Sequence, residues 1–91
     1  MKKRVVVKIS GQVQGINLRS MIKVRAVSSG IFGYVQNQPD GTVKIEAEGE
    51  KEALEDLIRW LNENPGAIRI EKLEDYWSDS QNKFSDFQIK W

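Results

Sequence analysis

Cysteine and histidine are both absent from this 91-residue sequence. Without cysteine, the chain has no disulfide, no thiolate metal site and no cysteine nucleophile. Without histidine, it has no imidazole for acid–base catalysis near neutral pH. Any catalysis must therefore use carboxylates, amides, Arg, Lys, hydroxyls, backbone dipoles or the substrate itself.

Long apolar runs are absent too. No stretch approaches the ~20 apolar residues that span a bilayer, and the short run Val5–Val7 ends at Lys8, too soon for the apolar part of a signal peptide. We therefore expect a cytoplasmic protein with no membrane partner. Lys and Arg number 14 against 13 Asp and Glu, for a net charge of +1, so charge gives no reason to expect nucleic-acid binding.

The residues that are present fit one small folded domain. The length allows a single modest core. A content of 40% apolar and 30% charged residues is ordinary for a globular protein. We therefore expect one domain over residues 1–91 that acts as a monomer.

Hydrophobic periodicity predicts two helices and five strands. Apolar residues spaced by four, such as Leu18, Ile22 and Ala26, are typical of a helix, and alternating β-branched residues are typical of strands. The expected elements are a strand at 4–9, a helix from Leu18 to a stop at Gly30, strands at 31–37 and 42–48, a helix at 50–62, and strands at 68–76 and 87–91. This order predicts an α+β fold, the ferredoxin-like β-α-β-β-α-β sandwich. Both helices would cover one face of an antiparallel sheet, with a short C-terminal strand added.

Finer expectations concern the strands and their connections. Pro39-Asp-Gly41 predicts the hairpin turn between the second and third strands, with Gly41 supplying a positive φ. Leu73 interrupts the alternation of the fourth strand and so allows a bulge or a bend, and the segment 77–83 is expected to be a polar loop. The sheet face opposite the helices is expected to be solvated, and it carries Lys8, Thr42, Lys44, Glu46 and Glu48.

The stretch Gly11-Gln-Val-Gln-Gly-Ile-Asn-Leu-Arg19 lies between the first strand and the first helix. Its glycines allow the backbone to curl so that successive N–H groups point inward, and the first turn of a helix adds N–H groups without internal partners. With Arg19 at its edge and no acidic side chain, this stretch favours a phosphate or a carboxylate. A tight turn followed by a surface Arg is the plainer alternative.

Asn37 closes the second strand in register with Gly33 and Val35, which points it to the helix-covered face. A hydrophilic amide at the end of a core-facing row suggests either a site residue or an Asn that starts the following turn.

Two motifs together resemble the acylphosphatase family. Gly11 to Arg19 is similar to its first signature, Gly-x-Val-Gln-Gly-Val-x-Phe-Arg. Gly33-Tyr-Val-Gln-Asn-Gln-Pro-Asp-Gly-Thr-Val43, followed by Gly49, fits the second signature at every defined position. The separation of Arg19 from Asn37 also fits, as does the closing Phe84-Ser-Asp-Phe87, so the resemblance covers essentially the whole chain.

The resemblance implies hydrolysis of an acyl phosphate to a carboxylate and inorganic phosphate, without a cofactor or a metal. By family analogy, Arg19 and the loop N–H groups bind the phosphoryl group, and Asn37 orients the attacking water. Arg19 and Asn37 are thus the expected catalytic residues. The expected substrate-binding residues are Gln14, Gly15, Ile16, Asn17, Leu18 and Arg19.

Three loop positions depart from the usual signature or vary within it. Ile16 replaces Val, Leu18 replaces Phe or Met, and Asn17 stands where prokaryotic relatives often have Gly. Leu18 is still apolar and fits a buried position, and Asn tolerates the left-handed conformation better than most residues. Because a misplacement of about 1 Å can cost ~100-fold in rate, these changes bear on efficiency.

Two other functions are open at the level of sequence. One is a catalytically weak or inactive anion-binding domain of the same fold. The other is a small RNA-binding module, which needs exposed aromatics on the central strands and a basic face that this sequence lacks. We expect packing rather than binding roles for the tryptophans Trp60 and Trp91, and either packing or a surface position for Trp77.

Overall fold

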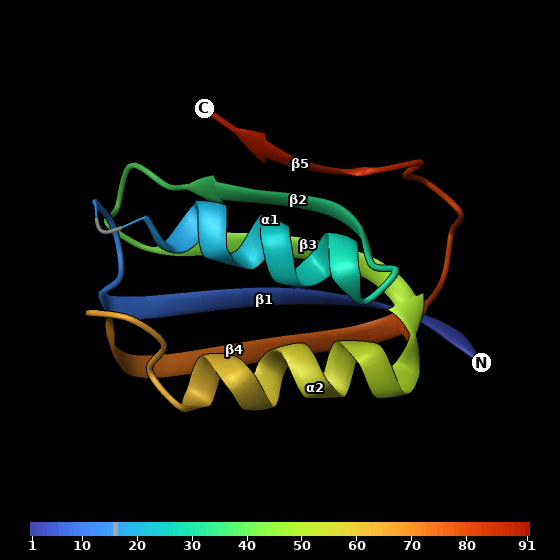
Figure 1. Ribbon diagram of the computed structural model, residues 1–91, viewed down its shortest axis with the longest axis horizontal. Coiled ribbons are helices and arrows are strands. Elements are labelled where there is room, and N and C mark those ends of the chain that lie inside the picture. The colour runs from blue at the N-terminus through green and yellow to red at the C-terminus, as the bar shows by residue number, and fades with distance from the viewer. Residues whose placement is uncertain (16) are drawn as a thin grey trace.

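A computed structural model describes residues 1–15 and 17–91. The elements are β1 (Lys2–Gln12), α1 (Leu18–Ser28), β2 (Phe32–Asn37), β3 (Val43–Glu50), α2 (Lys51–Asn62), β4 (Arg69–Asp79) and β5 (Phe87–Lys90). Figure 1 shows both helices on the same face of one five-stranded sheet, whose strand order is β4-β1-β3-β2-β5. The predicted ferredoxin-like arrangement is confirmed. The sheet is mixed rather than antiparallel throughout, because β5 runs parallel to β2.

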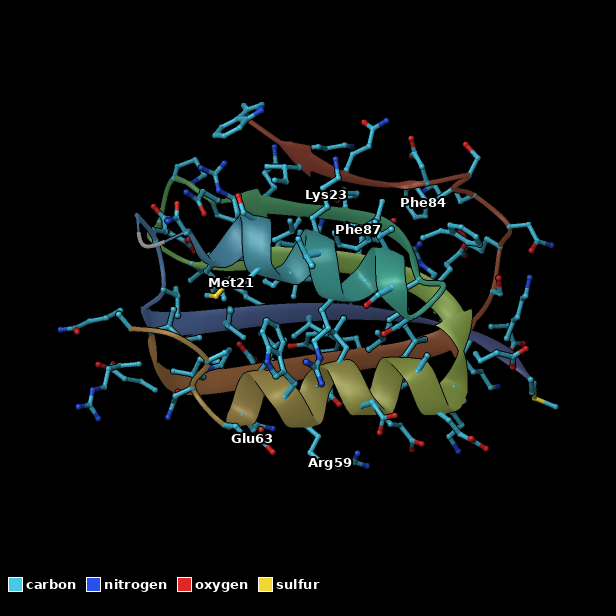
Figure 2. The ribbon with its side chains drawn as sticks, viewed as in Figure 1. Met21, Lys23, Arg59, Glu63, Phe84 and Phe87 are labelled. Carbon is cyan, nitrogen blue, oxygen red and sulfur yellow. The ribbon has the colours of Figure 1, made fainter. Side chains whose placement is uncertain are left out.

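The core fills the space between the sheet and the two helices. The predicted stripes are buried, with Leu18, Ile22 and Ala26 on α1 and Leu54, Leu57 and Leu61 on α2. They pack against the inward residues of the strands, among them Val5, Val7, Ile9, Val35, Ile45 and Phe87. Arg59 of α2 and Glu63, the residue after this helix, point away from this core in Figure 2.

β4 is longer than predicted. Val5 pairs with Trp77 and Lys3 with Asp79, so β4 takes in the first residues of the expected polar loop. Polar residues suit an edge strand, because one side of it faces water. Ser10 pairs with Lys72 but Gly11 with Ile70, which leaves Glu71 as an extra residue. That bulge explains why the alternation breaks before Leu73 and why both Ile70 and Leu73 pack against the core.

The sheet face opposite the helices is only partly solvated, so the sequence prediction for it was wrong at three positions. Lys8 is exposed, but Thr42, Glu46 and Glu48 are buried. Glu46 and Glu48 are covered by the segment 80–86: the Lys83 ammonium lies 3.5 Å from Glu46, and the backbone N–H groups at 81 and 83 donate to the Glu48 carboxylate at 2.6 and 2.9 Å. Thr42 lies at the hairpin turn, where its hydroxyl donates to Asp40 and its carbonyl accepts from Gln14. In the segment 80–86, the Phe84 ring packs edge-on against the Tyr34 ring, with centroids 6.0 Å apart. The sequence did not indicate this cover.

The β2–β3 hairpin forms as predicted. The Gln38 N–H donates to the Thr42 carbonyl at 2.8 Å and the Gly41 N–H donates to the Gln38 carbonyl at 3.1 Å. Gly41 has a φ of 90°, which confirms the positive φ expected of it. The turn therefore places the end of β2 beside the loop that follows β1 (Figure 1).

Candidate active site

A pocket of about 210 Å³ lies where the loop after β1, the start of α1 and the ends of β2 and β5 meet. It is lined by Val13, Gly15, Asn17, Leu18, Arg19, Ser20, Asn37, Ile89 and Trp91. A larger hollow of about 750 Å³ lies between α2 and β4 and shares no residue with this pocket. The smaller pocket is the candidate active site because an Arg, an amide side chain and a helix N-terminus converge on it.

The loop before α1 has the backbone conformation that the sequence suggested. Gly15 has a φ of 79° and Asn17 a φ of 61°, so both lie in the left-handed region. On either side of them, Val13 and Leu18 are buried in the core. Leu18 therefore keeps the apolar anchor that the usual aromatic would supply. Ile16, another expected substrate-binding residue, lies outside the described residues.

The first turn of α1 has backbone donors to offer. The Asn17 carbonyl already accepts from the Met21 N–H at 3.1 Å, while the Asn17 side chain makes no capping hydrogen bond. The N–H groups at the start of a helix have no partner within the helix, and they carry its positive dipole end. The first turn contains no acidic residue, and Arg19 adds a full positive charge there. This end of α1 is therefore suited to an anion.

The Asn37 side chain completes the polar wall of the pocket. Its Oδ1 atom is buried and accepts no hydrogen bond from any residue that the structure describes. A buried acceptor without a donor costs about 1–3 kcal/mol, so such an atom in a pocket is a place for a water or a ligand donor. The sequence left open whether Asn37 serves the turn or a site, and its position in the pocket favours the site.

Gln14 is not among the residues that line the pocket. Its Nε2 atom donates to the carbonyls of Gln38 and Thr42 at 2.9 and 2.8 Å, which joins the loop before α1 to the β2–β3 turn. That turn is further held by Asp40, which accepts from the hydroxyl and the N–H of Thr42. These hydrogen bonds, with Lys8 nearby, hold the pKa of the Asp40 carboxyl below its usual range. A substrate-binding role for Gln14 stays a prediction.

Trp91 is the residue that sequence reasoning assigned wrongly. It was expected to pack, yet 89% of its surface is exposed and its ring stacks on Arg19, with the guanidinium carbon 4.1 Å from the ring centroid. The pairing of β2 with β5 explains this. Gln36 pairs with Lys90, so Asn37 and Trp91 follow at neighbouring strand ends and on the same face. The parallel pairing was not evident from the sequence. Trp60, in contrast, packs against the core as expected.

Comparison with known proteins assigns the chain to a family. The acylphosphatase family model matches residues 5–89. The chain belongs to the acylphosphatase family. An acylphosphatase from Salinibacter ruber is 39% identical to it over 98% of this chain and 94% of that protein. Another acylphosphatase, from Caldanaerobacter subterraneus, is 37% identical over 98% of this chain and 99% of that protein.

Solved structures agree with this assignment. The crystal structure of acylphosphatase from Bacillus subtilis superposes with a TM-score of 0.90 at 25% identity and covers both chains fully. The structure of full-length HypF in its phosphate- and nucleotide-bound form also has a TM-score of 0.90, at 28% identity. That match covers 99% of this chain but 12% of HypF, so the acylphosphatase fold also occurs within longer proteins. Within the described residues, no helix is long and apolar enough to cross a membrane.

Proposed function

We propose that this pocket hydrolyses acyl phosphates. The observation that carries the proposal is the convergence on one small pocket of Arg19, the N-terminus of α1 and the buried Asn37 Oδ1, which has no donor among the described residues. Water would add to phosphorus while the bond from phosphorus to the acyl oxygen breaks. The acyl group leaves as a carboxylate with the bonding electrons, and both protons of the water end on the phosphate.

Arg19 and the loop amides are proposed to bind the phosphoryl group. Gly15 and Asn17 have the left-handed backbone conformation that allows N–H groups of a loop to face a bound anion, and the amides of the first turn of α1 would add to them. Phosphoryl transfer has a loose transition state in which charge spreads over the phosphoryl oxygens, so fixed donors and a guanidinium can supply most of the catalysis. We include the backbone N–H of Ile16 in this set by family analogy.

Asn37 is proposed to orient the attacking water. Its Oδ1, which accepts no hydrogen bond within the described part of the chain, can accept one hydrogen from that water, which leaves an oxygen lone pair directed at phosphorus. Since the chain has no histidine or cysteine, we propose that a phosphate oxygen of the substrate takes the proton. The carboxylate is a good leaving group, so no strong general acid is required.

The test is hydrolysis of benzoyl phosphate by the purified protein in the presence of EDTA, compared with the variants Arg19→Ala and Arg25→Ala. We expect metal-independent turnover that Arg19→Ala lowers by at least ~1,000-fold, together with loss of inhibition by inorganic phosphate. Arg25 is the matched control, because it is an exposed Arg on the same helix, outside the pocket.

Two outcomes would contradict the proposal. Turnover that persists in Arg19→Ala would place the reaction elsewhere. Binding of inorganic phosphate without turnover by the wild-type protein would instead support the alternative reading, an anion-binding domain that has lost its activity.

A further inference from the structure

Trp91 is exposed although it belongs to an apolar row. Phe87 and Ile89 of β5 alternate in sequence with Trp91, which follows the strand, and exposure along this row rises from 3% at Phe87 to 89% at Trp91. The core is therefore filled without this indole. Trp91 nevertheless lines the same pocket as Arg19 and Asn37. A large exposed aromatic side chain at a polar pocket is a feature of binding sites rather than of packing.

The contact with Arg19 leaves that guanidinium available. A guanidinium stacked on an aromatic face is attracted by the negative face of the ring, while its N–H groups lie in its own plane and stay free for hydrogen bonds. A carboxylate partner would instead occupy those N–H groups. None of the acidic side chains that the structure describes lies within ion-pair distance of Arg19. Trp91 thus holds Arg19 in place without competing with a bound phosphate.

The pocket has both polar and apolar lining residues. Arg19 and Asn37 supply polar side chains, and Gly15 lies in the loop before α1. The apolar lining residues are Val13, Leu18, Ile89 and Trp91, of which Val13 and Leu18 are buried in the core. At about 210 Å³ the pocket suits a phosphoryl group and its water. The rest of the substrate would extend beyond it, and Trp91 is an exposed aromatic residue of the lining.

We propose that Trp91 determines acyl-group specificity: its ring and Ile89 receive flat aromatic or apolar acyl groups, while its face positions Arg19. This inference rests on the proposed function for the identity of the ligand, an acyl phosphate. Within that class of ligands, contact with Trp91 would favour aromatic acyl groups over the acetyl group. Loss of one aromatic contact of this kind corresponds to about a tenfold change in affinity.

The experiment measures binding separately from turnover. Calorimetry with benzylphosphonate and methylphosphonate gives the ratio of their dissociation constants for the wild type, Trp91→Ala, Trp91→Phe and Trp77→Ala. Trp77 is the matched control, an exposed tryptophan on β4 outside the pocket. The wild type should bind benzylphosphonate about 10-fold more tightly than methylphosphonate. Trp91→Ala should abolish this preference, and Trp91→Phe and Trp77→Ala should keep most of it.

The same variants are then assayed with benzoyl phosphate and acetyl phosphate. Trp91→Ala should lower kcat/KM about 10-fold more for benzoyl phosphate than for acetyl phosphate. An unchanged preference in Trp91→Ala, or an equal loss for both ligands, would overturn the specificity role. Selective loss of benzylphosphonate binding in a protein without turnover would support this inference while refuting the proposed function.

Discussion

Arg19 lies in the first turn of α1, where the helix dipole disfavours a positive charge. The N-terminus of α1 carries a partial positive charge, and a cation near a helix N-terminus is unfavourable by about 0.3–1 kcal/mol at exposed positions. The stacking of Arg19 on Trp91 offsets part of this cost through the negative face of the ring. A bound phosphate would satisfy the helix amides and the guanidinium together, so a residue that is unfavourable alone becomes favourable with its ligand.

Asn37 is the residue whose role can be separated most cleanly from binding. Its replacement in Asn37→Ala removes the acceptor proposed for the water but leaves Arg19 and the loop amides in place. We expect kcat to fall by about 100- to 1,000-fold, with little change in inhibition by inorganic phosphate. Steady-state kinetics with benzoyl phosphate and phosphate as inhibitor measure both quantities.

The Asn37→Ala variant must be shown to be folded, because Asn37 ends β2 beside the hairpin turn. Gln36→Ala is a suitable control, since it alters the preceding residue of the same strand, whose side chain is outside the pocket. Equal losses of affinity and rate in a folded Asn37→Ala protein would make Asn37 a binding or structural residue instead.

At the level of elements, hydrogen bonds from the Gln14 side chain join the loop before α1 to the β2–β3 turn. Both hydrogen bonds go to backbone carbonyls of the turn. In Gln14→Leu, which keeps similar bulk, we expect the free energy of unfolding to fall by about 1–3 kcal/mol. We also expect kcat to fall by up to ~100-fold, because the loop and Asn37 would shift relative to each other. Urea unfolding and kinetics test both effects.

Gln12→Leu provides the control for this element. It makes the same chemical change at the exposed end of β1, outside the pocket. If Gln14→Leu lost stability but kept full activity, the Gln14 link would be structural only. If Gln12→Leu lowered activity as much, the effect would come from added apolar surface rather than from the lost hydrogen bonds.

On the scale of the whole molecule, the sheet face opposite the helices is held by a buried carboxylate. Glu46 accepts from the Tyr34 hydroxyl at 2.8 Å and forms an ion pair with Arg4, and the Lys83 ammonium lies 3.5 Å away. Burial alone would raise the pKa of Glu46, but the hydrogen bonds from Arg4 and Tyr34 outweigh it and lower the pKa below its ordinary value of 4.5. This network links β1, β2 and β3 with the segment that follows β4.

The lowered pKa of Glu46 predicts a pH dependence of stability. A carboxyl with a depressed pKa in the folded state stabilises the fold above its unfolded pKa, and this stabilisation is lost as the pH falls through the folded pKa. We expect Glu46→Gln to lower the free energy of unfolding by roughly 3 kcal/mol at pH 7, since Arg4 loses its counter-charge in a buried site. Plotted against pH, the free energies of unfolding of the wild type and the variant should converge below about pH 4.5.

Urea unfolding at several pH values, with Glu55→Gln as the control, checks this dependence. Glu55 is exposed on α2 and makes no ion pair with any described residue. If the free energies of unfolding of the wild type and Glu46→Gln changed in parallel with pH, the charge of Glu46 would not be what stabilises this face.

Most of the fold could be read from local patterns. The apolar stripes of α1 and α2 and the turn at Pro39-Asp-Gly41 depend on neighbours a few residues apart, so the sequence alone predicted them. The end of β4 was missed because polar residues on an edge strand resemble a loop until their pairing with β1 is known.

The sequence by itself determined the family and the fold class, because these depend on residue types and hydrophobic patterns along the chain. The roles of Arg19 and the glycine loop stay a prediction. The tertiary structure alone decided which distant segments meet: Trp91 beside Arg19, Gln14 on the hairpin turn, and the segment 80–86 over Glu46. Such contacts follow from which strands pair and from long-range packing. Hydrophobic periodicity indicates which face of a strand is buried, but it does not identify the neighbouring strand.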